Sequence, residues 1–120
     1  MDFDSAIQAH TNWKLRLFSA CKGSSKEKID VRTVEKDNLC ELGKWLHGDA
    51  KRYGADSSLA TLVRAHAEFH RSAAALALLI ERGQKAAAEK ILASPDSDFN
   101  KLSIRVVGQI LTLRSQHSPV

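Results

Sequence analysis

The segment Arg64-Ala65-His66-Ala67-Glu68-Phe69-His70 places two histidines four residues apart within the longest helical pattern of the chain. Residues at this spacing project from one face of an α-helix, one turn apart. Both histidines lie on an apolar face that includes Leu59, Leu62, Val63, Ala73, Leu76 and Ile80. A buried ring nitrogen without a partner costs on the order of 1–3 kcal/mol. The two imidazoles therefore need partners, and one metal ion would serve both.

The composition predicts a single helical domain over residues 1–120. Only two Pro and six Gly occur, and 43% of the residues are hydrophobic, which favours helices around one core. The net charge of +4 is spread along the chain without a basic run that carries aromatic residues, so nucleic-acid binding is not expected. Two cysteines, no apolar leader and no bilayer-length apolar run predict a cytoplasmic location and no membrane contact.

Hydrophobic periodicity predicts an all-α fold, a four-helix bundle with a short additional helix. The segment 31–36 is ambiguous between extended chain and a helical turn. The cap before the second helix is Asp37 or Asn38, and the cap before the last is Asp96 or Ser97. The predicted helices cover residues 4–22, 39–46, 56–82 and 86–93, and the last one ends near residue 116.

Four residues on or beside the core-facing stripes of three helices can bind zinc. Three imidazoles and one thiolate suit a tetrahedral Zn²⁺ site in the bundle core. Asp37 is a candidate acceptor for a hydrogen bond from a ligand, and backbone carbonyls are others. The competing interpretation is that the histidines are core residues hydrogen-bonded to their neighbours. The candidate ligand set is His10, Cys40, His66 and His70.

The remaining candidates have simpler explanations. The zincin motif requires Glu directly after its first His, whereas Ala67 follows His66 here. A closed tetrahedron also leaves no position for an activated water, so catalysis is not expected. His47 is expected to be a solvated or capping side chain, His117 a terminal residue and Cys21 a buried thiol. Trp13 and Trp45 are expected to be core anchors.

Three segments together resemble the chemoreceptor zinc-binding (CZB) domain family. They are Ala6-Ile7-Gln8-Ala9-His10-x-x-Trp13, Leu39-Cys40-Glu41-Leu42-Gly43-Lys44-Trp45 and His66-x-x-x-His70. The resemblance implies that the candidate ligand set holds zinc. It further implies a regulatory domain, often dimeric, attached to bacterial chemoreceptors or diguanylate cyclases. Such domains report zinc, or oxidants such as hypochlorous acid, through the zinc-bound cysteine.

The leading hypothesis is therefore a non-enzymatic zinc-dependent sensor that passes a helix rearrangement to an output domain. One version responds to zinc occupancy, and the other responds to oxidant at Cys40, because a metal-bound thiolate is deprotonated and open to oxidation. The alternative is a purely structural helical dimerisation module with zinc as a staple. A zinc hydrolase or lyase would need an open coordination position. The expected partners are a second copy of the chain and an output domain.

Overall fold

The computed structural model describes residues 3–22, 31–36, 41–48, 50 and 57–117. Regular structure in these ranges is entirely helical, which confirms the all-α prediction. None of the described helices has the length and apolar character needed to cross a lipid bilayer. The helices are α1 (Phe3–Cys21), α2 (Val31–Glu35), α3 (Glu41–His47), α4 (Ser57–Glu81), α5 (Lys85–Ala93) and α6 (Asp98–His117).

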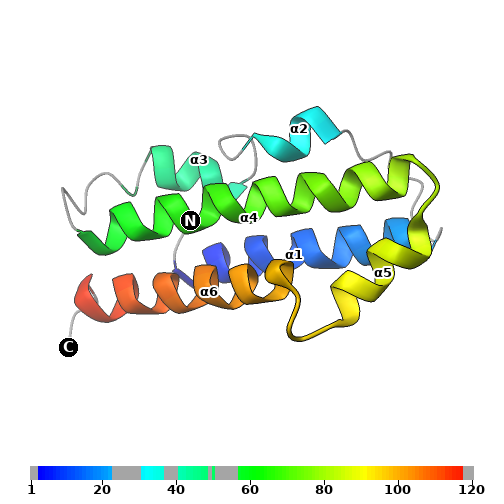
Figure 1. Cartoon of the computed structure of the whole chain (residues 1–120). Coiled ribbons are helices and arrows are strands. Elements are labelled where there is room, and N and C mark those ends of the chain that lie inside the picture. Colours follow the sequence, from blue (N-terminus) through cyan, green and yellow to red (C-terminus); the bar gives the residue numbers. More distant parts are fainter. Residues whose placement is uncertain (1–2, 23–30, 37–40, 49, 51–56, 118–120) are drawn as a thin grey trace.

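The helices lie in four rows, an arrangement compatible with the expected four-helix bundle. α1 and α4 each form one row, while α2 with α3, and α5 with α6, form the other two (Figure 1). α6 runs antiparallel to α1, so the start of α1 meets the end of α6. There the guanidinium of Arg114 donates a hydrogen bond to the carboxylate of Asp4 at 3.0 Å. The row of α2 and α3 and the row of α5 and α6 each contain two helices. In the first of these rows the sequence predicted a short helix over residues 39–46 and left the segment 31–36 open.

The core follows the apolar stripes of the three long helices. Phe69 of α4 is fully buried, and its ring lies 5.1 Å from that of Phe99 in α6, centroid to centroid. On α6 the buried side chains recur at alternating spacings of three and four, as expected for a helix that packs one face on its neighbours. The fully buried side chains of α6 are Phe99, Val106, Ile110 and Leu113.

The end of α4 matches the predicted stop at Gly83. The amide of Gln84 donates to the carbonyl of Leu79 at 2.8 Å, and that of Gly83 donates to Ile80 at 3.0 Å. These two bonds form a Schellman motif, which requires a left-handed residue. Gly83 supplies it with φ +80°. At the start of α6, Ser97 is the cap, because its hydroxyl accepts from the amide of Asn100 at 3.3 Å.

The ambiguous segment 31–36 contains the helical turn α2. Its sequence has β-branched residues, which do not favour a helix by themselves. Its buried Val34, 2% exposed, packs into the core of the bundle. Tertiary packing therefore settles the conformation that local propensity left open. The candidate caps Asp37 and Asn38 lie outside the described residues, as do residues 39 and 40 at the start of the predicted second helix.

Two glycines give opposite predictions for stability. Gly83→Ala is expected to destabilise the fold by about 1 kcal/mol, because alanine is strained in the left-handed region. Gly108→Ala is expected to stabilise it by about 0.5–1 kcal/mol. Gly108 lies inside α6, and an added Cβ there would meet no atom within 4 Å. Urea unfolding of both variants beside the wild type checks this pair. A gain of stability in the Gly83 variant would contradict the motif.

Candidate metal centre

His66 and His70 lie in the interior of the bundle, as the periodicity predicts. Their exposed fractions are 1% and 0%. The two rings come from consecutive turns of α4, and their centroids are 4.5 Å apart at an interplanar angle of 77°. The ring of Trp13, in α1, meets that of His70 edge-on at 5.5 Å. The histidine pair is thus enclosed by aromatic side chains rather than by water.

The orientation of the His70 ring is fixed by a backbone group of α2. Its Nδ1 atom lies 2.6 Å from the carbonyl oxygen of Val34. A carbonyl only accepts, so Nδ1 carries the proton and donates it. In the neutral ring the remaining nitrogen, Nε2, carries the lone pair, and this tautomer can bind a metal through Nε2. A backbone carbonyl that accepts from the second nitrogen is typical of histidines that bind zinc.

His10 reaches the same interior from α1. It is 2% exposed, and its ring lies 4.4 Å from that of Phe69, centroid to centroid. Its Nε2 atom lies 2.8 Å from the hydroxyl oxygen of Ser103 in α6. Its Nδ1 atom is buried and has no hydrogen-bond partner among the described residues. One nitrogen of this ring is therefore held by a hydroxyl, and the other is left for a further ligand.

Burial keeps His10 neutral. Loss of solvent is the main reason that the pKa of His10 falls to about 4, and the nearby His70 and Lys14 lower it further, while the bond to Ser103 opposes the change. A buried imidazole favours its uncharged form because the protein interior solvates the cation poorly. The neutral form is also the one that coordinates metals. The electrostatic effect of His70 on His10 shows that the two rings share one region of the core.

The histidines suit zinc in chemistry but do not form a complete site by themselves. Within the described ranges, no three His, Cys, Asp or Glu side chains come together closely enough to hold a metal ion. The fourth member of the candidate ligand set, Cys40, and the candidate acceptor Asp37 lie outside the described residues. The buried, neutral imidazole of His10 and its unsatisfied Nδ1 atom suit a Zn²⁺ ion, but the described side chains are not gathered into a metal site, and a thiolate would have to come from Cys40.

The other sequence candidates lie where they were expected, as far as they are described. Trp13 and Trp45 are core residues, 8% and 4% exposed, and Cys21 is a buried thiol. Burial raises the pKa of the Cys21 thiol, Glu89 raises it further, and Lys85 partly opposes this. His47 is exposed. The side chain of His117 lies outside the described residues.

Ser103 was missed by the sequence reasoning, although a signal for it exists. The inward positions of α6 alternate by four and three residues through Phe99, Ser103, Val106 and Ile110. A serine in this series is a polar group on a core-facing stripe, and such a group needs a partner inside the bundle. His10 is that partner.

Fold and site together define a helical bundle with three histidines buried in its core, His10, His66 and His70, and histidine is a residue type that binds metal ions. The family model of the chemoreceptor zinc-binding domain, CZB, matches residues 10–77, more than half of the chain. The chain belongs to this family, which comprises zinc-binding domains of signalling proteins. Comparison with curated proteins and with solved structures found no match in either set.

Proposed function

We propose that the domain is a zinc-dependent sensor in which the candidate ligand set binds one Zn²⁺ and Cys40 responds to oxidant. The observation that carries the proposal is the buried histidine cluster, above all the hydrogen bond of 2.6 Å from Nδ1 of His70 to the carbonyl oxygen of Val34. This bond leaves Nε2 as the only atom of the His70 ring that can coordinate.

Two of the four proposed ligands are each oriented by a hydrogen bond. Val34 of α2 holds His70, and Ser103 of α6 holds His10. The Nδ1 atom of His10 is then the atom offered to the metal, provided that Nε2 donates to the Ser103 hydroxyl. Bound zinc would keep the Cys40 sulfur as a thiolate and join α1, α4 and the segment before α3. Structural zinc contributes on the order of 10 kcal/mol in small domains.

The proposed response begins at the sulfur of Cys40. A thiolate that reacts with hypochlorous acid gains oxygen as a sulfenic acid, and chloride leaves with the electron pair. A sulfenic acid is a weaker ligand than a thiolate, so the segment that carries Cys40 would be released while the histidines of α4 stay in place. The released segment adjoins α3, which packs on α1, so the change reaches the first helix of the bundle. The output domain that reads this change, a cytoplasmic location and the absence of catalysis belong to the same proposal.

Metal content and oxidant-dependent zinc release test the proposal. Wild-type protein is expected to hold about one zinc per chain and to release it with hypochlorous acid, as measured with a chromogenic chelator. Cys40→Ser is expected to lower the zinc content, and any zinc that the variant retains is expected not to be released by the oxidant. Cys21→Ser is the matched control and is expected to behave as wild type, because the buried Cys21 thiol has a raised pKa and contains little thiolate.

The outcomes separate the two versions of the sensor. Weak, exchangeable zinc in wild-type protein would favour sensing by occupancy, whereas tight zinc released only by oxidant would favour the redox version. Wild-type protein that takes up no zinc, even when zinc is added back, would reject both versions.

A structural dimerisation module is the second candidate, and exposed apolar side chains on α6 favour it. Ile104 is 69% exposed and Leu111 is 40% exposed, and they lie two turns apart on that helix. A second copy of the chain could cover them. Light scattering measures whether the Cys40→Ser and Ile104→Ser variants are dimers. Together with the signal of the output domain, it separates the sensor from the structural dimerisation module. If Cys40→Ser leaves both dimer and signal intact while Ile104→Ser dissociates the dimer, the structural module is supported.

A further inference from the structure

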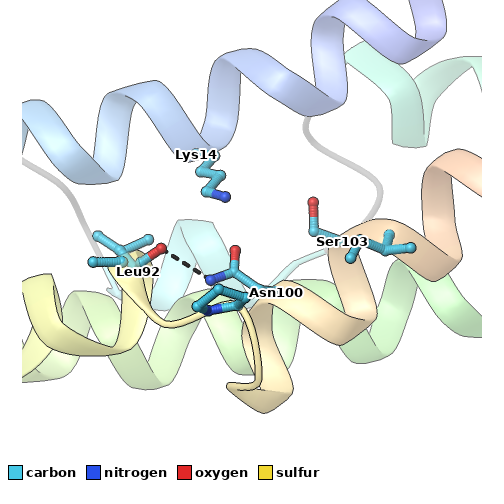
Figure 2. A pocket seen from close by; sticks show the side chains of 7 residues that line it. Lys14, Leu92, Asn100 and Ser103 are labelled. Atoms are coloured by element: carbon cyan, nitrogen blue, oxygen red, sulfur yellow. Dashed lines mark hydrogen bonds between the residues drawn. The ribbon is translucent and has the colours of Figure 1, made fainter.

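A pocket of about 240 Å³ lies between α1, the end of α5 and the first turns of α6. Its apolar wall is formed by Leu92, Ala93, Pro95 and Ile104. Its polar groups are those of Lys14, Asn100 and Ser103 (Figure 2). A recess with apolar walls and a few convergent polar groups is the usual form of a small-molecule site.

Asn100 directs an unsatisfied oxygen into this pocket. The residue is only 6% exposed. Its Nδ2 atom donates to the carbonyl oxygens of Leu92 at 2.9 Å and Ser94 at 2.6 Å, with Ile91 at 3.4 Å. Because carbonyls only accept, this end of the amide must be the NH₂ group. The Oδ1 atom is thereby fixed on the other side, where it is buried and has no hydrogen-bond partner among the described residues.

The ammonium group of Lys14 faces the Asn100 oxygen across the pocket, and the Ser103 hydroxyl points into the same space (Figure 2). Lys14 carries the charge of the pocket, while Asn100 and Ser103 are neutral. The Ser103 oxygen accepts from Nε2 of His10 in the tautomer that leaves Nδ1 for zinc. The hydroxyl proton of Ser103 is then free to be donated to a ligand.

We infer that the pocket binds a small α-hydroxy carboxylate of the size of lactate. Its carboxylate would accept from the Lys14 ammonium and the Ser103 hydroxyl, and its hydroxyl would donate to Oδ1 of Asn100. A monoanion neutralises the single charge of the pocket, whereas a zwitterionic amino acid does not. The methyl group of the ligand would contact Ile104 or Leu92. The contacts of Lys14, Asn100 and the apolar wall do not require zinc, because these residues are outside the candidate ligand set. The contact of Ser103 requires the His10 tautomer with its proton on Nε2, whether or not zinc is bound.

A titration of ¹⁵N-labelled full-length protein with L-lactate, at constant pH and ionic strength, tests the inference. Saturable shifts are expected at the side-chain amide of Asn100 and at the backbone amides of Ser103 and Ile104. Lys14→Gln is expected to weaken binding by about tenfold or more, because a hydrogen bond to a charged group is lost. Lys101→Gln is the matched control, since Lys101 is an exposed lysine of α6 that does not line the pocket.

Related ligands decide the chemistry. Propionate lacks the hydroxyl and is expected to bind more weakly than lactate, because Oδ1 of Asn100 would stay unsatisfied. Propionate that binds as well as lactate, or L-alanine that binds better, would overturn the assignment to an α-hydroxy acid. Shifts that do not saturate, or equal affinity in the Lys14 and Lys101 variants, would show that only water fills the pocket.

The titration also reports on the metal centre. The ring signals of His10 are expected to move as lactate binds, because Ser103 touches both the pocket and the His10 ring. Because metal-free protein can be titrated, loss of zinc binding and loss of lactate binding are distinguishable results.

Discussion

His70→Ala is expected to lower the zinc content of the protein from about one ion per chain to almost none. The substitution removes the ring that Trp13 contacts and the Val34 carbonyl orients. One of the four proposed ligands is lost with it. It also leaves the Val34 carbonyl without its donor, and loss of a buried hydrogen bond of this kind costs about 1–3 kcal/mol. Inductively coupled plasma mass spectrometry of protein purified with zinc measures the first effect, and thermal unfolding measures the second.

His47→Ala is the control for this experiment. His47 is an exposed histidine at the end of α3, so its removal is expected to change neither the zinc content nor the stability appreciably. Far-UV circular dichroism shows whether the His70 variant keeps its helices. A helical His70→Ala protein with the zinc content of the wild type would refute the assignment of His70 as a ligand.

Phe69→Ala is expected to destabilise the protein by about 3–5 kcal/mol, a large part of the total stability of a domain of this size. Phe69 is 0% exposed, and its ring contacts the rings of His10 in α1 and Phe99 in α6. Truncation therefore opens a cavity where three long helices meet, next to the histidine cluster. Chemical denaturation monitored by tryptophan fluorescence gives the change in the free energy of unfolding.

Two further variants keep this prediction testable if Phe69→Ala does not fold. Phe69→Leu retains most of the volume and is expected to cost clearly less. Leu15→Ala removes a leucine that is 57% exposed on α1, and surface changes of this kind usually cost less than about 0.5 kcal/mol. A similar cost for Phe69→Leu and Leu15→Ala would contradict the central position of Phe69.

The long helices could be predicted because their apolar positions recur over many turns. The buried series of α6 and the two histidines of α4 both follow from a period of 3.6 residues. The end of α4 followed from Gly83, since few residues other than glycine adopt φ +80°. The helical turn α2 could not be decided, because its conformation depends on contacts with α4, far along the chain.

The sequence identified the candidate ligands of the site more readily than the groups that orient them by hydrogen bonds. Position on a stripe identified His10, His66 and His70 as interior residues, which their burial confirms. Their role as ligands, and that of Cys40, stays a prediction. The sequence suggested either Asp37 or a backbone carbonyl as a hydrogen-bond acceptor, and the acceptor of His70 within the described residues is the Val34 carbonyl. A backbone carbonyl leaves no trace in residue identity, so only the fold reveals it.

The ion pair between Asp4 and Arg114 has a practical consequence for biosensor construction. It joins the first turn of α1 to a late turn of α6, with 3.0 Å between the charged atoms. The two turns lie at the end of the bundle where α1 begins and α6 ends (Figure 1). Donor and acceptor fluorophores fused beyond these two turns would start close together, where resonance energy transfer is most efficient. A ligand that spreads α1 from α6 would lower the transfer, so the domain could serve as a ratiometric reporter without an added linker peptide.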